Sequence, residues 1–448
     1  MQSKKAVFAA LGMFAAILVL AVVIVFGFLS ARKSYHLPFN ITVTFGMDVH
    51  TQKNFCWYTS EEVEKGYVYY MEDTGAGFDM DKCIVIEAQS EKVVQKYPVD
   101  SIPEEKNPEL EDRTFTRHRA FVSDLKPGTR YLYRLGEGDN LSDVYTFKTP
   151  GQGKDFSFII VSDSQGYKRS DFEYYRRVLE KAQDMFGDVD FYMHLGDFVD
   201  DGKNFLQWKY VLDIPRYIMA NNTFVPVAGN RDDMEVFEYF TLGSVYDTRP
   251  MANGYYSFSF NDVHFVVLYT AGNKSLPKKQ MSFLEDELKK HKDSRVVVLT
   301  HKAPYTNANH ADDKEIVALR EDLLPVFDKY NVDLVLQGHD HFFFRSEPIH
   351  EGKVGNYTYE KVMDGEDEVD MLSDVQGTIY LINSSAGVSR YDGTFREMED
   401  IHAFKSFNMN NPTFTYCTVT ENGIILKTYE VNVMRQRVQL IDSFGIRS

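Results

Sequence analysis

Apolar residues follow two different patterns along this chain, and the change between them divides the sequence. From Leu37 to about Pro150 they come in short alternating runs separated by turn residues, with no stretch of helical periodicity. Strand-sized runs of this kind are typical of an all-β sandwich. From Gly151 onward, buried strand-like runs alternate with amphipathic segments of helical length. This alternation predicts an α/β domain.

The second pattern can be followed element by element. It predicts helices at 171–186, 279–290 and 314–330, a further helix before residue 224, and strands at 156–161, 191–195, 224–227, 255–260, 263–268, 295–299, 332–337, 377–382, 414–420 and 424–429. The acidic stretch Gly352–Asp374 has no clear periodicity. We interpret it as an inserted surface loop.

A long apolar run precedes both patterns. Residues Ala6–Leu29 carry no charge over 24 positions, between basic pairs at 4–5 and 32–33. This length spans a bilayer as one helix, and it exceeds the apolar core of a cleavable signal peptide. We therefore expect an uncleaved signal anchor in the cell membrane, with a single pass and the rest of the chain extracytoplasmic. The predicted organisation is a cytosolic tip and anchor at 1–34, a β-sandwich at 35–150 and an α/β domain at 151–448.

The net charge of the chain limits the kinds of partner that it can bind. The formal net charge of the 448 residues is -17. No basic face remains to meet a phosphate backbone, so we expect no nucleic-acid binding. A phosphate ester stays compatible with this charge, because bound metal ions reverse the local sign.

Cys56, Cys83 and Cys417 match no zinc spacing. Either Cys56 and Cys83 form a bridge, or all three are free thiols.

Residue types that bind metals follow the predicted strands. Within Val332–Phe344, a buried strand ends at Gly338 and two histidines follow. Polar residues at the carboxyl ends of parallel strands meet at one edge of a sheet. The candidates at such ends are Asp163, Asp197, Asn230, His301, His339 and His341.

This donor set has a chemical preference. Its mixture of nitrogen and oxygen suits iron, zinc or manganese, and it contains too much nitrogen for calcium. Six ligands exceed what one tetrahedral ion takes, and they fit two ions that share a carboxylate. In such a pair, at roughly 3.5–4 Å separation, a metal-bound hydroxide attacks and phosphate esters are the usual substrates.

The motifs SDSQ, GDFVD, GNRDD, LTHKAPY and GHDH occur in this order and resemble the calcineurin-like metallophosphoesterase superfamily. Trp57–Thr59, the LKPGT corner at Leu125–Thr129 and YTFKTP at Tyr145–Pro150 make the first part similar to the fibronectin-type-III-like domain of purple acid phosphatases. The likeness covers roughly residues 37–448. It implies a four-layer α/β/β/α domain in which two packed sheets are flanked by helices.

The same resemblance implies roles for the candidate ligands. Asp197 would bridge two metal ions. Asp163 and His341 would complete one ion, and Asn230, His301 and His339 the other.

Four further positions matter for the chemistry. Gln165 and Asp200 occupy metal-site positions where the family has a His and the Tyr whose charge transfer to iron gives the purple colour. Arg231 replaces a His that meets the phosphoryl group. His310, nine residues after His301, matches a His that the resemblance implies as the acid for the leaving group.

The sequence therefore predicts a membrane-anchored, extracytoplasmic phosphoesterase with two transition-metal ions (iron, zinc or manganese). The favoured reaction is hydrolysis of phosphomonoesters by a metal-bridging hydroxide, as in acid phosphatases. One alternative is a phosphodiesterase acting on nucleotides or envelope phosphodiesters. A second is a surface metal-binding protein without catalysis. The substrate, the mono- or diester preference and the oligomeric state stay open.

Overall fold

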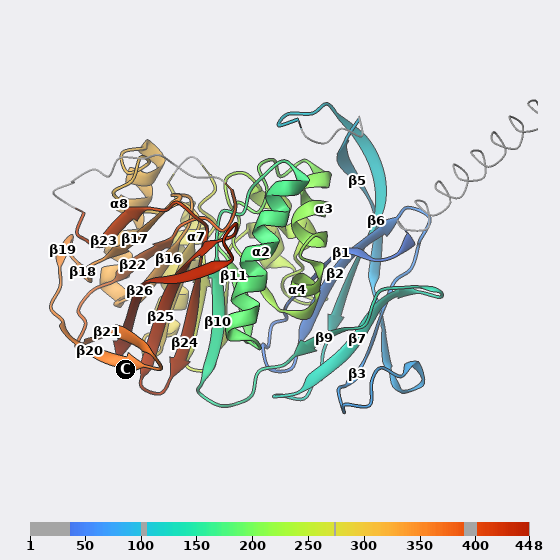
Figure 1. Cartoon of the computed structure of the whole chain (residues 1–448), viewed down its shortest axis with the longest axis horizontal. Helices are drawn as coiled ribbons and strands as arrows, with labels where there is room; N and C mark the ends of the chain where they lie inside the picture. Colours follow the sequence, from blue (N-terminus) through green and yellow to red (C-terminus); the bar gives the residue numbers. More distant parts are fainter. Residues whose placement is uncertain (1–35, 100–104, 273–274, 389–400, 448) are drawn as a thin grey trace, which may run out of the picture.

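The computed structural model describes residues 36–99, 105–272, 275–388 and 401–447. A β-sandwich is followed by a larger α/β domain (Figure 1). The predicted anchor at Ala6–Leu29 lies outside the described residues. Across the four described ranges, no helix is both long and apolar enough to cross a bilayer.

Two antiparallel sheets form the N-terminal domain, so the prediction of an all-β domain is confirmed. The first sheet has the order β1 (Phe39–Phe45), β2 (Lys53–Ser60), β6 (Leu110–Val122), β5 (Gln89–Pro98). The second has the order β4 (Ile84–Glu87), β3 (Tyr67–Glu72), β7 (Arg130–Glu137), β8 (Asn140–Leu141), with β9 (Tyr145–Lys148) paired to β7 and a 3-10 turn at Met80–Lys82. Trp57, Phe55 and Tyr133 are fully buried in the core of this domain.

Two large mixed sheets form the second domain. The first has the order β12 (Phe224–Pro226), β11 (Phe191–His194), β10 (Phe156–Val161), β24 (Thr413–Thr420), β25 (Gly423–Asn432), β26 (Arg437–Arg447), β21 (Asp367–Ser373), β20 (Thr358–Asp364). The second has the order β13 (Tyr256–Phe260), β14 (Val263–Val267), β15 (Arg295–Thr300), β16 (Leu334–Gln337), β22 (Ile379–Asn383), β17 (Phe342–Ser346), β23 (Ala403–Asn408). A two-stranded ribbon, β18 (Ile349–His350) with β19 (Lys353–Val354), is joined by a bridge between Ile349 and Thr378 to the residue before β22.

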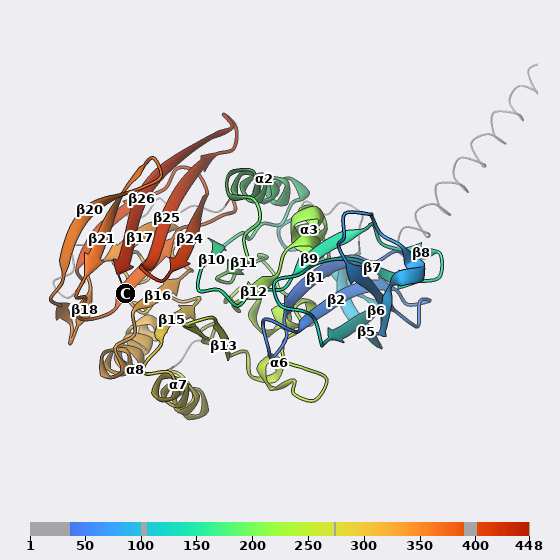
Figure 2. The same cartoon turned by 90° about the horizontal axis from the view of Figure 1, so that it is seen from below.

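The sheets pack face to face with helices outside, giving the expected α/β/β/α layers (Figure 2). The helices of this domain are α2 (Arg169–Phe186), α3 (Phe205–Asp213), α4 (Arg216–Asn221), α5 (Val236–Tyr239) after a 3-10 turn at Asp233–Glu235, α6 (Arg249–Asn253), α7 (Lys278–Lys290) and α8 (Lys314–Tyr330). Strand β14 shows why four layers form, because both of its faces are apolar. Phe265 packs into the core between the sheets, whereas Val266 packs into the core under α7 and α8. A strand that is apolar on both faces must be covered on both.

Strand β1 joins the two domains. All seven of its residues are buried. The Thr42 hydroxyl donates to the carbonyl of Tyr239 at 2.5 Å, and the Asn40 N–H donates to Asp213 Oδ1 at 2.9 Å. The sandwich is therefore packed against the second domain through hydrogen bonds as well as apolar contacts.

The prediction of a loop at Gly352–Asp374 is wrong. Strands β20 and β21 pair there as an antiparallel hairpin that turns at Gly365, and β21 pairs with β26 in parallel. Val369 of β21 is fully buried, and the hairpin forms one edge of the first sheet. The dense charge of the outer face hides this short apolar alternation. Strands β5, β17 and β23 were not predicted either.

All three cysteines lie within the described residues and are free. The Cys56 thiol lies 3.6 Å from the carbonyl of Glu238 at the domain junction, and the Cys83 thiol lies 3.3 Å from the carbonyl of Asp79. Of the two alternatives for Cys56 and Cys83, the structure has free thiols.

Candidate metal centre

The C-terminal ends of parallel strands in both large sheets meet at one place. The six residues predicted as ligands follow β10, β11, β12, β15 and β16: Asp163, Asp197, Asn230, His301, His339 and His341. Hydrogen bonds cross between the sheets here. His301 Nδ1 lies 2.8 Å from the carbonyl of Leu195, and the His339 N–H donates to Asp163 Oδ2 at 3.1 Å. The packing of two sheets thus builds one composite site.

The backbone turns sharply at three of these positions. Asp163, Asp197 and His339 have φ values of 53°, 54° and 68°. Non-glycine residues in this left-handed region are uncommon and concentrate at functional sites. Gly229 makes the close packing feasible, because a Cβ there would overlap the backbone nitrogen and Oδ1 of Asp197. The strands therefore end by turning side chains toward a shared point.

Three electron-pair donors converge around His301. Its Nδ1–H donates to Leu195, so in the neutral ring Nε2 carries the lone pair. Nε2 lies 3.0 Å from Asn230 Oδ1 and 3.3 Å from Asp197 Oδ1. Three lone pairs at this separation repel one another unless a cation or a proton lies between them. This is the arrangement expected of metal ligands whose orientation is fixed by an outer hydrogen bond.

A second group of donors forms around Asp163. His341 Nε2 lies 3.3 Å from Asp163 Oδ1 and 3.2 Å from the side-chain amide nitrogen of Gln165. Asp163 is fully buried, yet its Oδ1 accepts no hydrogen bond from the described residues. A buried carboxylate oxygen without a donor is costly. Its position therefore fits an ion ligand. One ligand atom each from Asp163, Asp197 and His301 lie within 4.8 Å of one another, so the two groups are contiguous.

The electrostatics of the site favour a cation. Burial alone would lower the pKa of His301, but Asp197 and its neighbours raise it to about 9. Burial would raise the pKa of Asp197, but His301 holds it below its usual value. A proton on His301 therefore takes the position of positive charge in the ion-free protein. The donor set fits transition-metal ions, which would displace that proton.

His339 and His310 lie side by side at the site. Their ring centroids are 4.4 Å apart, and the ring of His339 is 5.3 Å from that of His301. Burial, His301 and His310 together lower the pKa of His339. A neutral imidazole is the form that binds a metal. His310 Nδ1 lies 2.7 Å from Asp313 Oδ2, and its side chain stays 29% exposed. The structure thus places His310 next to a predicted ligand.

Two of the residues predicted for the site, Arg231 and Asp200, lie at the edge of the cluster of candidate ligands. The Arg231 N–H donates to Asp197 Oδ1 at 2.8 Å, whereas its side chain is exposed. The carboxylate of Asp200 lies 3.9 Å from Lys106 Nζ of the N-terminal domain. Among the described contacts, none joins Asp200 to the clustered ligands.

Sequence reasoning missed Asp232 as a residue that organises the site. Its carboxylate accepts the N–H groups of Asp197 at 3.2 Å, Phe198 at 2.9 Å and Gly229 at 2.8 Å. It ties the loop after β11 to the loop after β12. Burial and the nearby Asp197 raise its pKa to about 8. Its place two residues after Asn230 is the signal that could have found it.

Family models match most of the described chain. Residues 156–343 match the calcineurin-like phosphoesterase family, and residues 38–149 match the purple acid phosphatase N-terminal domain.

Curated relatives have low identity. A probable purple acid phosphatase 20 of Arabidopsis thaliana is 25% identical over 246 residues, covering 52% of this chain and 56% of the relative. Purple acid phosphatase 5 of the same plant is 28% identical over 241 residues, covering 52% and 55%. The chain thus spans about half the length of these curated relatives. Acid phosphatase type 7 of Danio rerio is 23% identical, with 67% and 71% covered.

Solved structures share the fold. The purple acid phosphatase PPD1 of yellow lupin (Lupinus luteus) superimposes with a TM-score of 0.70 at 16% identity, covering 92% of this chain and 74% of that one. The structure of PhoD gives a TM-score of 0.57 at 14% identity, covering 92% and 90%.

Proposed function

Because the chain belongs to the calcineurin-like phosphoesterases of the purple acid phosphatase type, we propose that it hydrolyses phosphomonoesters with two bound transition-metal ions. The observation that carries this proposal is the convergence of six donor residues at the strand ends, with Asp197 between two groups. Asp163, His341 and Gln165 would hold one ion. Asn230, His301 and His339 would hold the other.

The bound ions would supply positive charge that activates water and stabilises the phosphoryl oxygens. The chain's own residues do the rest. Arg231 fixes Asp197 through its backbone and leaves its guanidinium exposed beside the site. A guanidinium keeps its proton at working pH and can hold two phosphoryl oxygens at once. Arg231 therefore binds and orients the ester.

His310 is the candidate proton donor. Its Nδ1 lies 2.7 Å from Asp313 Oδ2, and an imidazole held in this way can exchange a proton with the leaving oxygen. Its partial exposure suits a group that must be reprotonated from solvent after each turnover. Asp313 would act as a positioning residue that fixes the ring.

We further propose that residues 6–29 anchor the protein in the cell membrane with both domains extracytoplasmic. The uncharged stretch of 24 residues supports this.

The test is to compare Asp197→Asn with Asp201→Asn. Both changes remove one carboxylate from the same loop, but the Asp201 carboxylate accepts the N–H of Lys203 at 3.1 Å and contacts none of the candidate ligands in the described residues. We expect Asp197→Asn to lose at least about 100-fold in turnover of para-nitrophenyl phosphate and to lose bound metal, because a shared ligand is weakened. Asp201→Asn should match the parent.

Three outcomes contradict the proposal in different ways. Faster turnover of bis(para-nitrophenyl) phosphate than of the monoester would indicate a diesterase. Metal binding without turnover of either ester would indicate a binding protein. Full activity in Asp197→Asn would exclude the predicted centre.

A further inference from the structure

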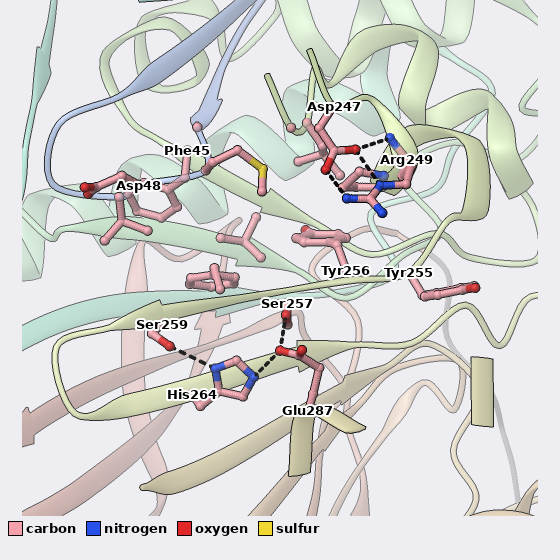
Figure 3. A pocket seen from close by; sticks show the side chains of 18 of the residues that line it. Phe45, Asp48, Asp247, Arg249, Tyr255, Tyr256, Ser257, Ser259, His264 and Glu287 are labelled. Atoms are coloured by element: carbon pink, nitrogen blue, oxygen red, sulfur yellow. Dashed lines mark hydrogen bonds and ion pairs between the residues drawn. The ribbon is translucent and has the colours of Figure 1, made fainter. Parts of the chain in front are cut away.

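A cavity of about 840 Å³ lies away from the strand-end centre. Its walls come from the turn after β1, from the segment between α5 and β13, from strands β12, β13 and β14, and from α7 (Figure 3). None of the predicted ligands of the strand-end centre lines it. His264, in its wall, pairs with Val296, five residues before His301 along β15. At 3.3 Å per residue this is about 16 Å along the strand, so the cavity is a separate place.

Three side chains of types that bind metal ions meet in the wall of this cavity. His264 lies on β14 and points to the same side as Val266, which packs under α7 and α8. Glu287 and His291 are four residues apart at the end of α7 and therefore share one face of the helix. One ligand atom from each of the three lies within 4.8 Å of the others.

His264 is the unusual member of this group. Only 2% of its surface is exposed, and its Nδ1 lies 2.9 Å from the hydroxyl of Ser259. Its Nε2 lies 3.1 Å from Glu287 Oε2, but without hydrogen-bond geometry. Glu287 Oε2 is held by the Ser257 hydroxyl at 2.7 Å (Figure 3). A buried imidazole is thus aimed at a fixed carboxylate without a hydrogen bond between them.

The surroundings favour a divalent cation at this point. The carboxylate of Glu287 is fixed by Ser257 and lies beside His264 Nε2, so an oxygen donor and a nitrogen donor already converge there. His291 follows the last residue of α7, and the C-terminal end of a helix attracts positive charge.

We propose that His264, Glu287 and His291 form a metal site of the zinc type, separate from the strand-end centre. Two imidazoles and one carboxylate match the ligand set of zinc sites that keep a fourth position open. That position would face the cavity, where water or a small anion could occupy it.

One adjustment is needed for binding. The rings of His264 and His291 are stacked, with centroids 3.6 Å apart and planes 7° from parallel. Because imidazole binds a metal in the plane of its ring, the two rings cannot serve one ion while stacked. His291 is the less buried of the two and would turn about its side-chain bonds.

The experiment counts ions by difference. The parent, His291→Ala and Lys290→Ala are dialysed against micromolar free zinc, and bound zinc is measured by elemental analysis. We expect His291→Ala to bind one ion fewer per chain than the parent, and Lys290→Ala to bind as many as the parent. Equal zinc content in the parent and His291→Ala would overturn the proposal. Turnover of para-nitrophenyl phosphate should be unchanged in His291→Ala.

A second readout does not depend on the strand-end centre. In an Asp197→Asn background, cobalt should still give the visible absorption of a four-coordinate site, and adding Glu287→Gln should remove it. If the cobalt absorption persists in the double variant, the ion binds at another place and the proposed site is wrong. Circular dichroism checks that each variant is folded.

Discussion

Arg231 has two separable roles, because its backbone holds Asp197 while its guanidinium is exposed. Replacing the side chain by alanine leaves the backbone N–H in place. We therefore expect Arg231→Ala to keep its metal content and to lose about 100- to 1,000-fold in kcat/KM, as when a transition-state contact is removed. The loss should be similar for alkyl and aryl phosphates. Arg435→Ala, at an exposed arginine, is the control. A variant that loses its metal would show that the side chain also supports the ligands.

His310 should behave differently. If it protonates the leaving oxygen, its removal matters most for esters whose leaving group is a poor one. We expect His310→Ala to lose about 100- to 10,000-fold on an alkyl phosphate and much less on para-nitrophenyl phosphate. His350 is a matched control, since its Nδ1 lies 3.6 Å from Asp328 in a similar His–Asp pair elsewhere. Equal losses on both esters would remove His310 as the acid.

Asp200 bears on the visible spectrum. It stands where purple acid phosphatases carry a coordinating tyrosine, and its carboxylate lies near Lys106. No tyrosinate is available from that position for charge transfer to iron. We expect the iron-loaded protein to lack an intense mid-visible band, as absorption spectroscopy would record. Such a band would mean that another tyrosine coordinates.

The candidate ligands were identifiable in the sequence because each follows a buried strand within four residues, so a short local pattern carries the information. The residues that hold those ligands were not. Asp232 binds N–H groups of two loops, and Ser162 donates to the Asp163 carboxylate. Such contacts depend on how the loops meet after the sheets have packed, and single-sequence patterns do not encode that meeting.

Elements with strong periodicity were predicted close to their observed bounds. Helix α8 occupies the predicted residues 314–330 even though Pro325 lies inside it. Strand β5 was missed because its exposed polar residues outnumber its apolar ones. Hairpin β20–β21 was missed for the same reason. Strands β5 and β20 lie at the edges of their sheets. Edge strands commonly carry charged side chains that protect their unpaired backbone groups, and these charges mask the apolar alternation.

The hairpin offers a test at the scale of elements. Leu372 of β21 is 4% exposed and belongs to the core of the second domain. We expect Leu372→Ala to lower the free energy of unfolding by about 2–5 kcal/mol, as large-to-small changes in a core do. Glu366→Ala, in the exposed turn of the same hairpin, should stay within about 0.5 kcal/mol of the parent. Urea denaturation measures both. Similar urea midpoints for the two variants would show that Leu372 does not stabilise the core and would support the interpretation of this segment as a surface loop.

At the scale of the whole molecule, the two domains share one core. Phe39, Tyr58 and Phe115 of the sandwich surround Phe205 of the second domain, with ring centroids between 4.5 and 6.1 Å apart. The sequence pattern that predicts a division near residue 150 gave no sign of this contact. Apolar residues that serve a domain junction have the same periodicity as those inside a domain.

Two truncations separate the anchor from the sandwich. Residues 1–34 precede the described fold, so a chain that begins at residue 35 should be soluble and keep kcat/KM for para-nitrophenyl phosphate within about twofold.

A chain that begins at residue 151 loses the aromatic side chains that cover Phe205. Each buried aromatic side chain contributes about 1.5–3 kcal/mol, and a folded domain has only about 5–15 kcal/mol in total. We therefore expect the shorter chain to aggregate or to melt well below the longer one. Size-exclusion chromatography and thermal melting measure both outcomes. A stable, active chain from residue 151 would show that the sandwich is dispensable, and a folded but inactive chain from residue 35 would show that the N-terminal segment contributes to the site.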